Sequence, residues 1–253
     1  MARQIIFAAV LLITLGVFTY TILRIIAFFR LTQPAFPIRD FGRRFALMVK
    51  IAFGQTKIFR RPVIGFFHAL VFWGFCVILI GSIEMVIDGL AGTEKALKFL
   101  GVVYDIIMAS GDIFALLVAI SIIIFLFRRL FLHIKRFEGI EMKHSNHVDA
   151  IIALTMILLL MLSLMGMNSA YYSLKVKTVE PLDGVYPVSS WLSIIYNGSS
   201  IKAIELIYEI CWWTHIVLIF IFANILPYSK HFHVFLSVPN VFLSRLDPLG
   251  KLP

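Results

Sequence analysis

Long apolar runs alternate along the chain with shorter stretches that carry most of its charged residues. Five of these runs are close to the roughly 20 residues that an α-helix needs to cross a bilayer core. They extend over about Ile5 to Phe28, Val63 to Val86, Val103 to Phe127, Ala150 to Met167 and Ile207 to Pro227. The pattern predicts an all-α membrane protein in which a single domain, residues 1–253, forms a five-transmembrane-helix bundle. Composition agrees, because a water-soluble core could not hide 60% hydrophobic residues.

Lysine and arginine are concentrated in alternate connections between these runs. Nine lie between Arg24 and Arg61, five between Arg128 and His147 and three in the C-terminal tail, so 17 of the 23 fall on one side of the predicted bundle. The positive-inside rule makes this side cytoplasmic, which places the N-terminus outside and the C-terminus inside. The formal net charge of +9 then reflects topology and attraction to anionic lipid, and it gives no support for nucleic-acid binding.

Histidines mark both ends of the last apolar stretch. The segment from Cys211 to Phe235 predicts one continuous helix, with His215 toward its outer end and His233 toward its inner end. These two histidines are 18 positions apart, or five turns at about 3.6 residues per turn, so both rings leave the same face roughly 27 Å apart. His231 is about 160° away round the helix and should face elsewhere. The spacing therefore predicts two separate sites near opposite membrane faces, one at each histidine.

A third histidine, His68, lies about six residues inside the cytoplasmic boundary of the second helix. A histidine at that depth costs free energy unless it is ligated or, as the alternative here, hydrogen-bonded to another helix. Because the second and fifth helices run antiparallel, His68 and His233 can approach one haem iron from opposite sides. Two imidazole ligands leave no open coordination position, which favours electron transfer over oxygen chemistry.

Three of the carboxylates within or beside the apolar runs are candidates for function. Glu84 and Asp88, one turn apart near the outer end of the second helix, are either interfacial carboxylates or proton acceptors in quinone chemistry. Asp112, in the third helix, should be protonated or partnered. A second class of function is also open, a haem-free transporter or proton-conducting bundle whose polar pathway uses His68, Asp112 and His215. Against it stands the absence of inverted repeats in the sequence.

The two cysteines, Cys76 and Cys211, have no CxxC spacing. We therefore expect no iron–sulfur cluster or zinc site built from this chain's own cysteines.

Four stretches of the sequence resemble a known membrane family. They are GQTKIFRRPVIGFFH at the second helix, IDGLAGTEK after it, and CWWTH and PYSKHFHVFLSVPN at the fifth. Over essentially its whole length the chain resembles the five-helix, haem b membrane domain of the nitrate reductase gamma subunit, the heterodisulfide reductase membrane subunit and DsrM-type proteins. It is most similar to the N-terminal membrane domain of bacterial iron–sulfur-binding oxidoreductases.

In that family, four histidines of the second and fifth helices bind two stacked haems. His68, His215 and His233 match three of these ligands, whereas the fourth position is Ile78 in this sequence. The resemblance therefore implies one haem b held by His68 and His233, and it leaves two roles for His215. This residue either binds a second haem, completed by a ligand such as a methionine of the fourth helix, or serves a quinone.

The resemblance also implies a function. We expect a cytochrome b-type component of a quinone-linked oxidoreductase in the bacterial cytoplasmic membrane, relaying electrons between a cytoplasmic iron–sulfur partner and the menaquinone or quinone pool. Electron-transfer flavoprotein is the implied upstream donor. Similar sequences continue into an iron–sulfur domain, so the chain is expected to be a split subunit or the membrane part of a larger oxidoreductase. Its basic inner surface should either dock that partner or contact anionic lipid. The residues of this surface are Arg39, Arg43, Arg44, Lys57, Arg60 and Arg61.

Overall fold

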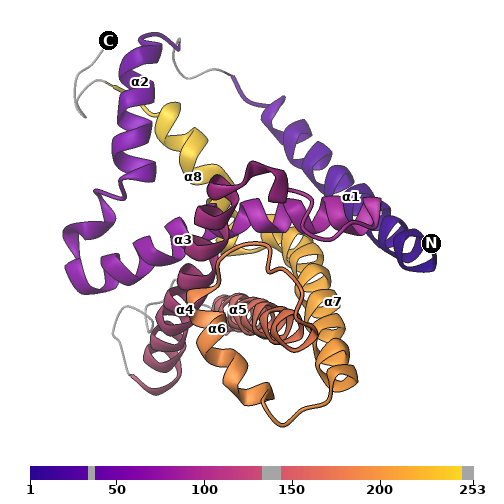
Figure 1. The fold of residues 1–253 in the computed structure, drawn as a ribbon. Helices are drawn as coiled ribbons and strands as arrows, with labels where there is room; N and C mark the ends of the chain where they lie inside the picture. Colours follow the sequence, from indigo (N-terminus) through magenta and orange to yellow (C-terminus); the bar gives the residue numbers. More distant parts are fainter. Residues whose placement is uncertain (34–37, 133–143, 247–253) are drawn as a thin grey trace.

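The computed structural model describes residues 1–33, 38–132 and 144–246, apart from the side chains of residues 144–146. Within these ranges every regular element is a helix (Figure 1). Five of the described helices are long and apolar enough to cross a membrane. They are α1 (Ala2–Phe29), α3 (Pro62–Ala91), α4 (Val102–Phe131), α5 (His144–Thr178) and α7 (Ile201–Ile225). The predicted fold class, an all-α bundle with five apolar spans, is confirmed.

Shorter helical elements join the spans at the two ends of the bundle. They are α2 (Phe41–Met48), the π-helical turn η1 (Val49–Phe53), α6 (Pro187–Leu192), α8 (His233–Phe242) and the 3-10 turns η2 (Ile58–Arg60), η3 (Lys98–Leu100), η5 (Ser193–Tyr196), η6 (Leu226–Tyr228) and η7 (Lys230–Phe232). Helices α2 and α8 lie side by side at the end where α3 begins and α7 ends (Figure 1). Helix α2 lies within the basic connection between the first two spans, and α8 lies in the C-terminal tail.

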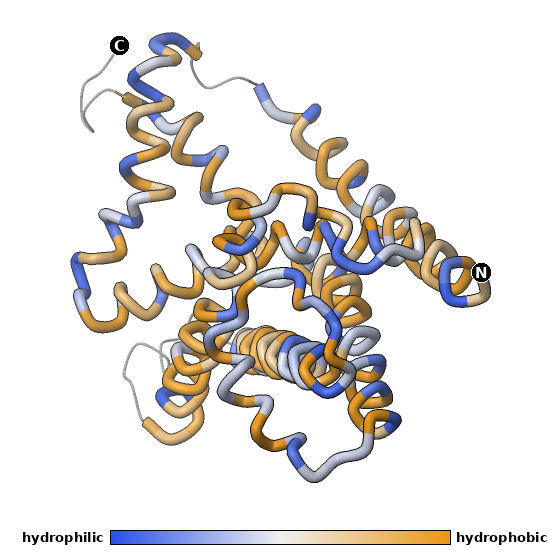
Figure 2. The backbone as a smooth tube through the Cα atoms, viewed as in Figure 1, coloured by the Kyte–Doolittle hydropathy of each residue, from blue (hydrophilic) through white to orange (hydrophobic). Residues whose placement is uncertain are grey.

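Helix α5 is the centre of the bundle and packs against both α4 and α7. Buried side chains from these three helices form the main core. Among them are Ala115, Val118, Ile122, Leu160, Met161, Trp212, Ile216 and Phe220. Figure 2 shows hydrophobic residues along most of each long helix and more hydrophilic residues in the connections. Many of the large hydrophobic residues on these helices are exposed, among them Leu12, Leu79 and Ile123. Such all-round hydrophobicity is what a lipid environment requires.

Helix α1, which has no charged residue between Arg3 and Arg24, is largely peripheral, but its N-terminal end is firmly attached. The ring of Phe7 is fully buried and fills the space beside Gly89, where an added Cβ atom would come within 2.6 Å of the ring. Arg3 forms a 2.7 Å ion pair with Glu209 and lies 4.5 Å from the ring centre of Trp212. These contacts join α1 to α3 and α7 at one end of the bundle.

The prediction of one continuous helix from Cys211 to Phe235 is wrong. Helix α7 ends at Ile225, and two 3-10 turns separated by the extended residue Ser229 precede α8. Pro227 has no backbone N–H to continue the helical hydrogen bonds, which accounts for the break. His215 and His233 therefore lie on different helices, and the helical period cannot relate their directions.

Candidate functional site

The structure brings His68 and His233 together at the end of the bundle that holds α2 and α8. His68 lies in the second turn of α3, and His233 is the first residue of α8. Their ring centres are 6.3 Å apart and their planes are inclined by 31°. The two rings therefore lie close together, one from each of two chain segments far apart in the sequence.

Hydrogen bonding defines how His233 can act. Its Nδ1 lies 3.0 Å from the carbonyl oxygen of Lys230. A carbonyl can only accept, so Nδ1 carries the proton and Nε2 keeps a free lone pair, which is the tautomer of a metal ligand. In the partner ring, the Nδ1 atom of His68 is buried without a hydrogen-bond partner in the described structure. A buried nitrogen without a hydrogen-bond partner is one that a ligand can satisfy.

The separation of the two rings is compatible with a bis-histidine haem. A metal–imidazole bond of about 2 Å, with the ring centre about 1 Å beyond the nitrogen on each side, requires ring centres roughly 6 Å apart. The observed 6.3 Å agrees with that spacing. A structural zinc site fits less well because it normally takes four ligands, and the described residues contain no group of three or more His, Cys, Asp and Glu side chains that could hold a metal ion.

A third imidazole, that of His231, lies beside the pair. Its ring centre is 6.0 Å from that of His233, and its Nδ1 is 3.0 Å from Ser229 Oγ. Burial lowers the pKa of His231, and the nearby carboxylate of Asp149 opposes that shift. With its pKa below the ordinary value, His231 is neutral at pH 7.

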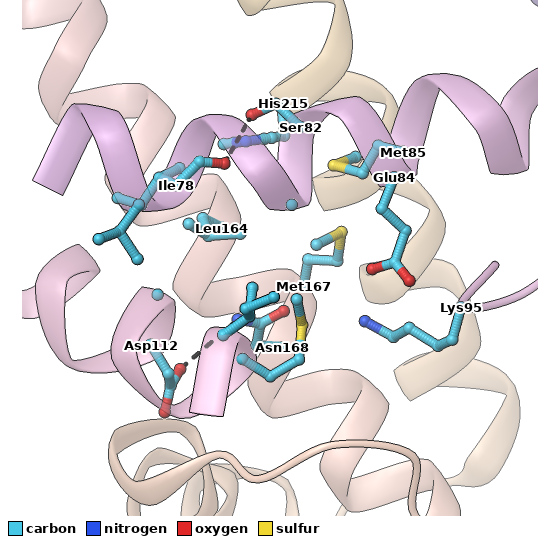
Figure 3. A pocket seen from close by; sticks show the side chains of 15 residues that line it. Ile78, Ser82, Glu84, Met85, Lys95, Asp112, Leu164, Met167, Asn168 and His215 are labelled. Carbon is cyan, nitrogen blue, oxygen red and sulfur yellow. Dashed lines mark hydrogen bonds between the residues drawn. The ribbon is translucent and has the colours of Figure 1, made fainter. Parts of the chain in front are cut away.

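At the opposite end, an interior cavity of about 50 Å³ lies between α3, α4, α5 and α7. Figure 3 shows Glu84 and Lys95 entering it on one side, Ile78 on the other, and His215 above. A larger cavity of about 300 Å³ lies toward the N-terminal end of α1, with Arg3 in its wall. Glu84 and Lys95 line both cavities, so these two side chains stand at the boundary between them.

His215 is held in a single orientation. Its side chain is 1% exposed, and its Nδ1 lies 3.0 Å from both the Leu160 carbonyl oxygen and Ser163 Oγ. The Ser163 hydroxyl donates to that same carbonyl, so Nδ1–H is the donor from the imidazole and Nε2 is unprotonated. This Nε2 atom is buried without a hydrogen-bond partner in the part of the chain described. This unprotonated nitrogen can accept a hydrogen bond or bind a metal ion.

Ile78, the position at which the resemblance implied a fourth histidine, lines the same cavity as His215. A hydrocarbon side chain cannot bind iron. The sulfur atoms available among the lining residues belong to Met85, Met108 and Met167. Of these, Met167 lies on α5, the fourth span, where a replacement ligand was expected.

The two carboxylates near the outer end of α3 have different surroundings. Glu84 is 3% exposed and accepts hydrogen bonds from the Leu97 backbone N–H at 3.0 Å and from the Tyr104 hydroxyl at 3.1 Å. Asp88 instead closes the following turn. Its oxygens accept from the Thr93 hydroxyl at 2.7 Å and from two backbone N–H groups, those of Lys95 and Ala96, at 3.0 Å each. Of the two, only Glu84 lines the cavity that contains His215.

Lys95 is a site residue that sequence reasoning missed. Its ammonium nitrogen lies 4.8 Å from the ring centre of Tyr171 and 5.3 Å from that of Tyr186. Burial by itself lowers the pKa of Lys95, but the neighbouring tyrosines, Tyr186 foremost, more than offset it and leave the pKa above its ordinary value. The side chain is therefore a buried cation. Periodicity could not reveal it, because the residue follows a helix and is buried by segments more than 70 positions away.

Asp112 has a structural partner. It is fully buried, and one carboxylate oxygen accepts from the Val188 N–H at 2.8 Å and the Ser189 N–H at 2.9 Å. The Ser189 hydroxyl donates to the other oxygen. Asp112 thus accepts hydrogen bonds from the first turn of α6, and both of its carboxylate oxygens are used. The expectation that this carboxylate is partnered is confirmed.

The basic surface at the end that holds α2 and α8 is smaller than the sequence suggested. Arg44 is 3% exposed and donates to the carbonyl oxygens of Phe242 at 2.9 Å and Ser244 at 2.7 Å. It ties α2 to the end of α8, where carbonyl groups have no helical partners. Its inclusion in a docking surface is therefore wrong. The other residues proposed for this surface are exposed, namely Arg39, Arg43, Lys57, Arg60 and Arg61.

Comparison with known proteins finds two relatives. The chain is 27% identical to the "Probable iron-sulfur-binding oxidoreductase FadF" of Bacillus subtilis over 255 aligned positions, covering 99% of this chain and 34% of that protein. It is 25% identical to the "EtfAB:quinone oxidoreductase" of Syntrophomonas wolfei over 200 positions, covering 78% of this chain and 27% of that protein. The chain thus spans about a third or less of the length of these relatives. No family model and no solved structure matches it.

Proposed function

We propose that this protein is a membrane cytochrome b-type component that relays electrons between an iron–sulfur partner and quinone. The observation that carries the proposal is the close pair of His68 and His233, with ring centres 6.3 Å apart. The relatives support it in general terms, since one is named as an iron–sulfur-binding oxidoreductase and the other as a quinone oxidoreductase. Five apolar helices agree with a multi-pass membrane protein. We place it in the bacterial cytoplasmic membrane.

His68 and His233 would hold the iron of haem b, His233 through its unprotonated Nε2 atom. Bound in this way, haem b supplies one-electron transfer and has no open position for oxygen. The chain contributes the orientation of both rings. The Lys230 carbonyl fixes the protonated nitrogen of His233, and the helix α3 carries His68 on a rigid element.

The cavity beside His215 would bind the quinone head group. The unprotonated Nε2 of His215 can accept a hydrogen bond from a hydroquinone O–H, and the Lys95 ammonium can donate to a quinone oxygen. The cavity of about 50 Å³ is smaller than a head group, so side chains must move on binding. Three of its lining residues are methionines, whose flexible side chains suit such repacking.

Glu84 would carry protons between this site and the outer cavity. Oxidation of a hydroquinone releases two electrons and two protons, and reduction of a quinone takes up the same number. Glu84 lines both cavities and is already hydrogen-bonded to the Tyr104 hydroxyl, so its carboxylate can exchange a proton with either side. Asp88 is less suited to this role because three donors of the 93–96 turn hold its oxygens.

On the inner face, the exposed residues Arg60 and Arg61 lie just before α3, which carries His68. We assign this basic surface to the docking of an acidic iron–sulfur partner or domain, with electron-transfer flavoprotein upstream. Charge complementarity of this kind accelerates association and makes it sensitive to salt.

The absorption spectrum of the purified chain, with haem counted per chain, tests the proposal. We expect a dithionite-reduced low-spin haem b band and one haem per chain. A chain without haem would contradict the proposal and favour a transporter or proton-conducting bundle. That alternative has little support from geometry, since Asp112, one of its three pathway residues, is engaged by α6. Two haems per chain would instead assign His215 to a second haem, with Met167 as the first ligand to test.

A further inference from the structure

The break between α7 and α8 is held from a third helix. Asp149, near the start of α5, directs its Oδ2 atom toward this break. The oxygen accepts hydrogen bonds from the Ser229 hydroxyl at 3.0 Å and from the Lys230 backbone N–H at 3.1 Å. A broken helix leaves backbone N–H groups without helical partners, and the Asp149 carboxylate supplies an acceptor for one of them.

The same short segment orients His233. Asp149 holds the N–H of Lys230, and the carbonyl oxygen of Lys230 accepts the proton of His233 Nδ1 at 3.0 Å. A continuous chain of contacts therefore leads from the Asp149 carboxylate, through one backbone residue, to the imidazole that lies beside His68. If the turn moved, the hydrogen bond that selects the tautomer of His233 would move with it.

Ser229 adds a second connection to this turn. Its hydroxyl donates to Asp149 and also accepts from the backbone N–H of His231 at 3.1 Å, which caps the turn η7. Fixed in this way, the residues from Ser229 to His233 have little freedom to rotate. His233 is the first residue after this turn, so its backbone position depends directly on the cap.

We propose that Asp149 is a positioning residue for the inner haem, acting through Ser229 and Lys230 on His233. The inference rests on the proposed function, because it assumes that His233 binds haem iron. It assigns Asp149 two effects. The carboxylate holds Nε2 of His233 toward His68, and its negative charge, close to the ligand, favours the oxidised over the reduced haem. Outer-shell partners of ligating histidines commonly act in both ways.

The test compares Asp149→Asn with the wild-type chain in detergent or membranes. Loss of the charge should raise the midpoint potential of the inner haem. Weaker hydrogen bonds from Ser229 and Lys230 to the side chain at position 149 should reduce haem affinity by roughly 10- to 100-fold. Ser229→Ala, which removes the hydrogen bonds of the hydroxyl but keeps the carboxylate and its bond to the Lys230 N–H, should shift both quantities in the same direction by less. As a matched control, Asp183→Asn removes a carboxylate that pairs with Lys98 at the opposite end, and should change neither.

A second measurement does not depend on haem. In the haem-free chain, hydrogen exchange at the Lys230 amide should be slow in the wild type and faster in Asp149→Asn, because this N–H donates to Asp149. Unchanged potential, haem affinity and exchange in Asp149→Asn would overturn the inference while leaving the proposed function standing. A wild-type chain that binds no haem would instead refute the proposed function, whatever the exchange data show.

Discussion

His68 and His233 are 165 positions apart in the chain, yet their ring centres lie 6.3 Å apart. They meet because α3 begins, and α7 leads into α8, at the same end of the bundle (Figure 1). Each ring also has a nitrogen that the protein leaves available, which is Nε2 in His233 and the unpartnered Nδ1 in His68.

Replacement of His68 or His233 by Ala should abolish the low-spin haem b spectrum, because a haem with one axial ligand in an apolar pocket loses both affinity and its six-coordinate spectrum. Pyridine haemochrome analysis and reduced-minus-oxidised spectra of the purified variants measure this. His231→Ala is the control, since it removes the neighbouring imidazole and should retain haem. A full low-spin spectrum in His68→Ala would end the assignment.

His215→Ala should lower quinone turnover by about tenfold, the equivalent of one lost hydrogen bond to the substrate, and should leave one haem per chain. The cause is loss of the buried Nε2 that faces the cavity. Turnover with a soluble quinone analogue and the haem count are the two measurements. If the wild type holds two haems and His215→Ala loses one, the quinone assignment of this residue is incorrect.

Glu84→Gln should reduce quinone turnover by about 100-fold without loss of haem, because the amide cannot accept a proton from the site. Asp88→Asn should act mainly on the 93–96 turn that its carboxylate closes, with a smaller effect on turnover. Turnover at several pH values, with haem content as a check on folding, separates the two variants. Wild-type turnover in the double variant would remove both residues from the proton route.

Asp112→Ala should destabilise the protein by roughly 3 kcal/mol, since it leaves two backbone N–H groups and a hydroxyl of α6 without their acceptor. Thermal unfolding followed in detergent measures the effect. Asp183→Ala breaks a partly exposed ion pair and should cost less than about 1 kcal/mol. Unchanged thermal stability combined with loss of activity would argue for a role of Asp112 in a polar pathway.

Reversal of charge in Arg60→Glu, Arg61→Glu should slow haem reduction by the cytoplasmic partner about tenfold at low salt, with haem content and membrane insertion unchanged. The difference from wild type should shrink as salt is added, because ions screen exposed charges. Stopped-flow reduction kinetics give both results. Lys202→Glu, a reversal at an exposed lysine of the opposite end, should have no effect. Equal rates at low salt would assign the arginines to lipid contact.

The sequence by itself determined the class of fold. Whether a stretch of about 20 residues can cross a bilayer depends on its own hydropathy, so all five spans were predictable from local composition. Their antiparallel order also predicted that His68 and His233 would lie at one end. Hydropathy cannot place the ends of helices, however, and α5 extends well beyond the predicted Ala150 to Met167 on both sides.

Only the tertiary structure decided how the polar residues are used. In the sequence, Asp112 and Arg44 cannot be distinguished from charged residues with a functional role. Their structural partners lie 77 and 198 positions away. The burial of Lys95 beside Tyr171 and the restraint of His233 by Asp149 are likewise set by packing between helices. Such contacts depend on which helix faces meet, and an apolar helix that is hydrophobic on all sides gives no signal of which face that is.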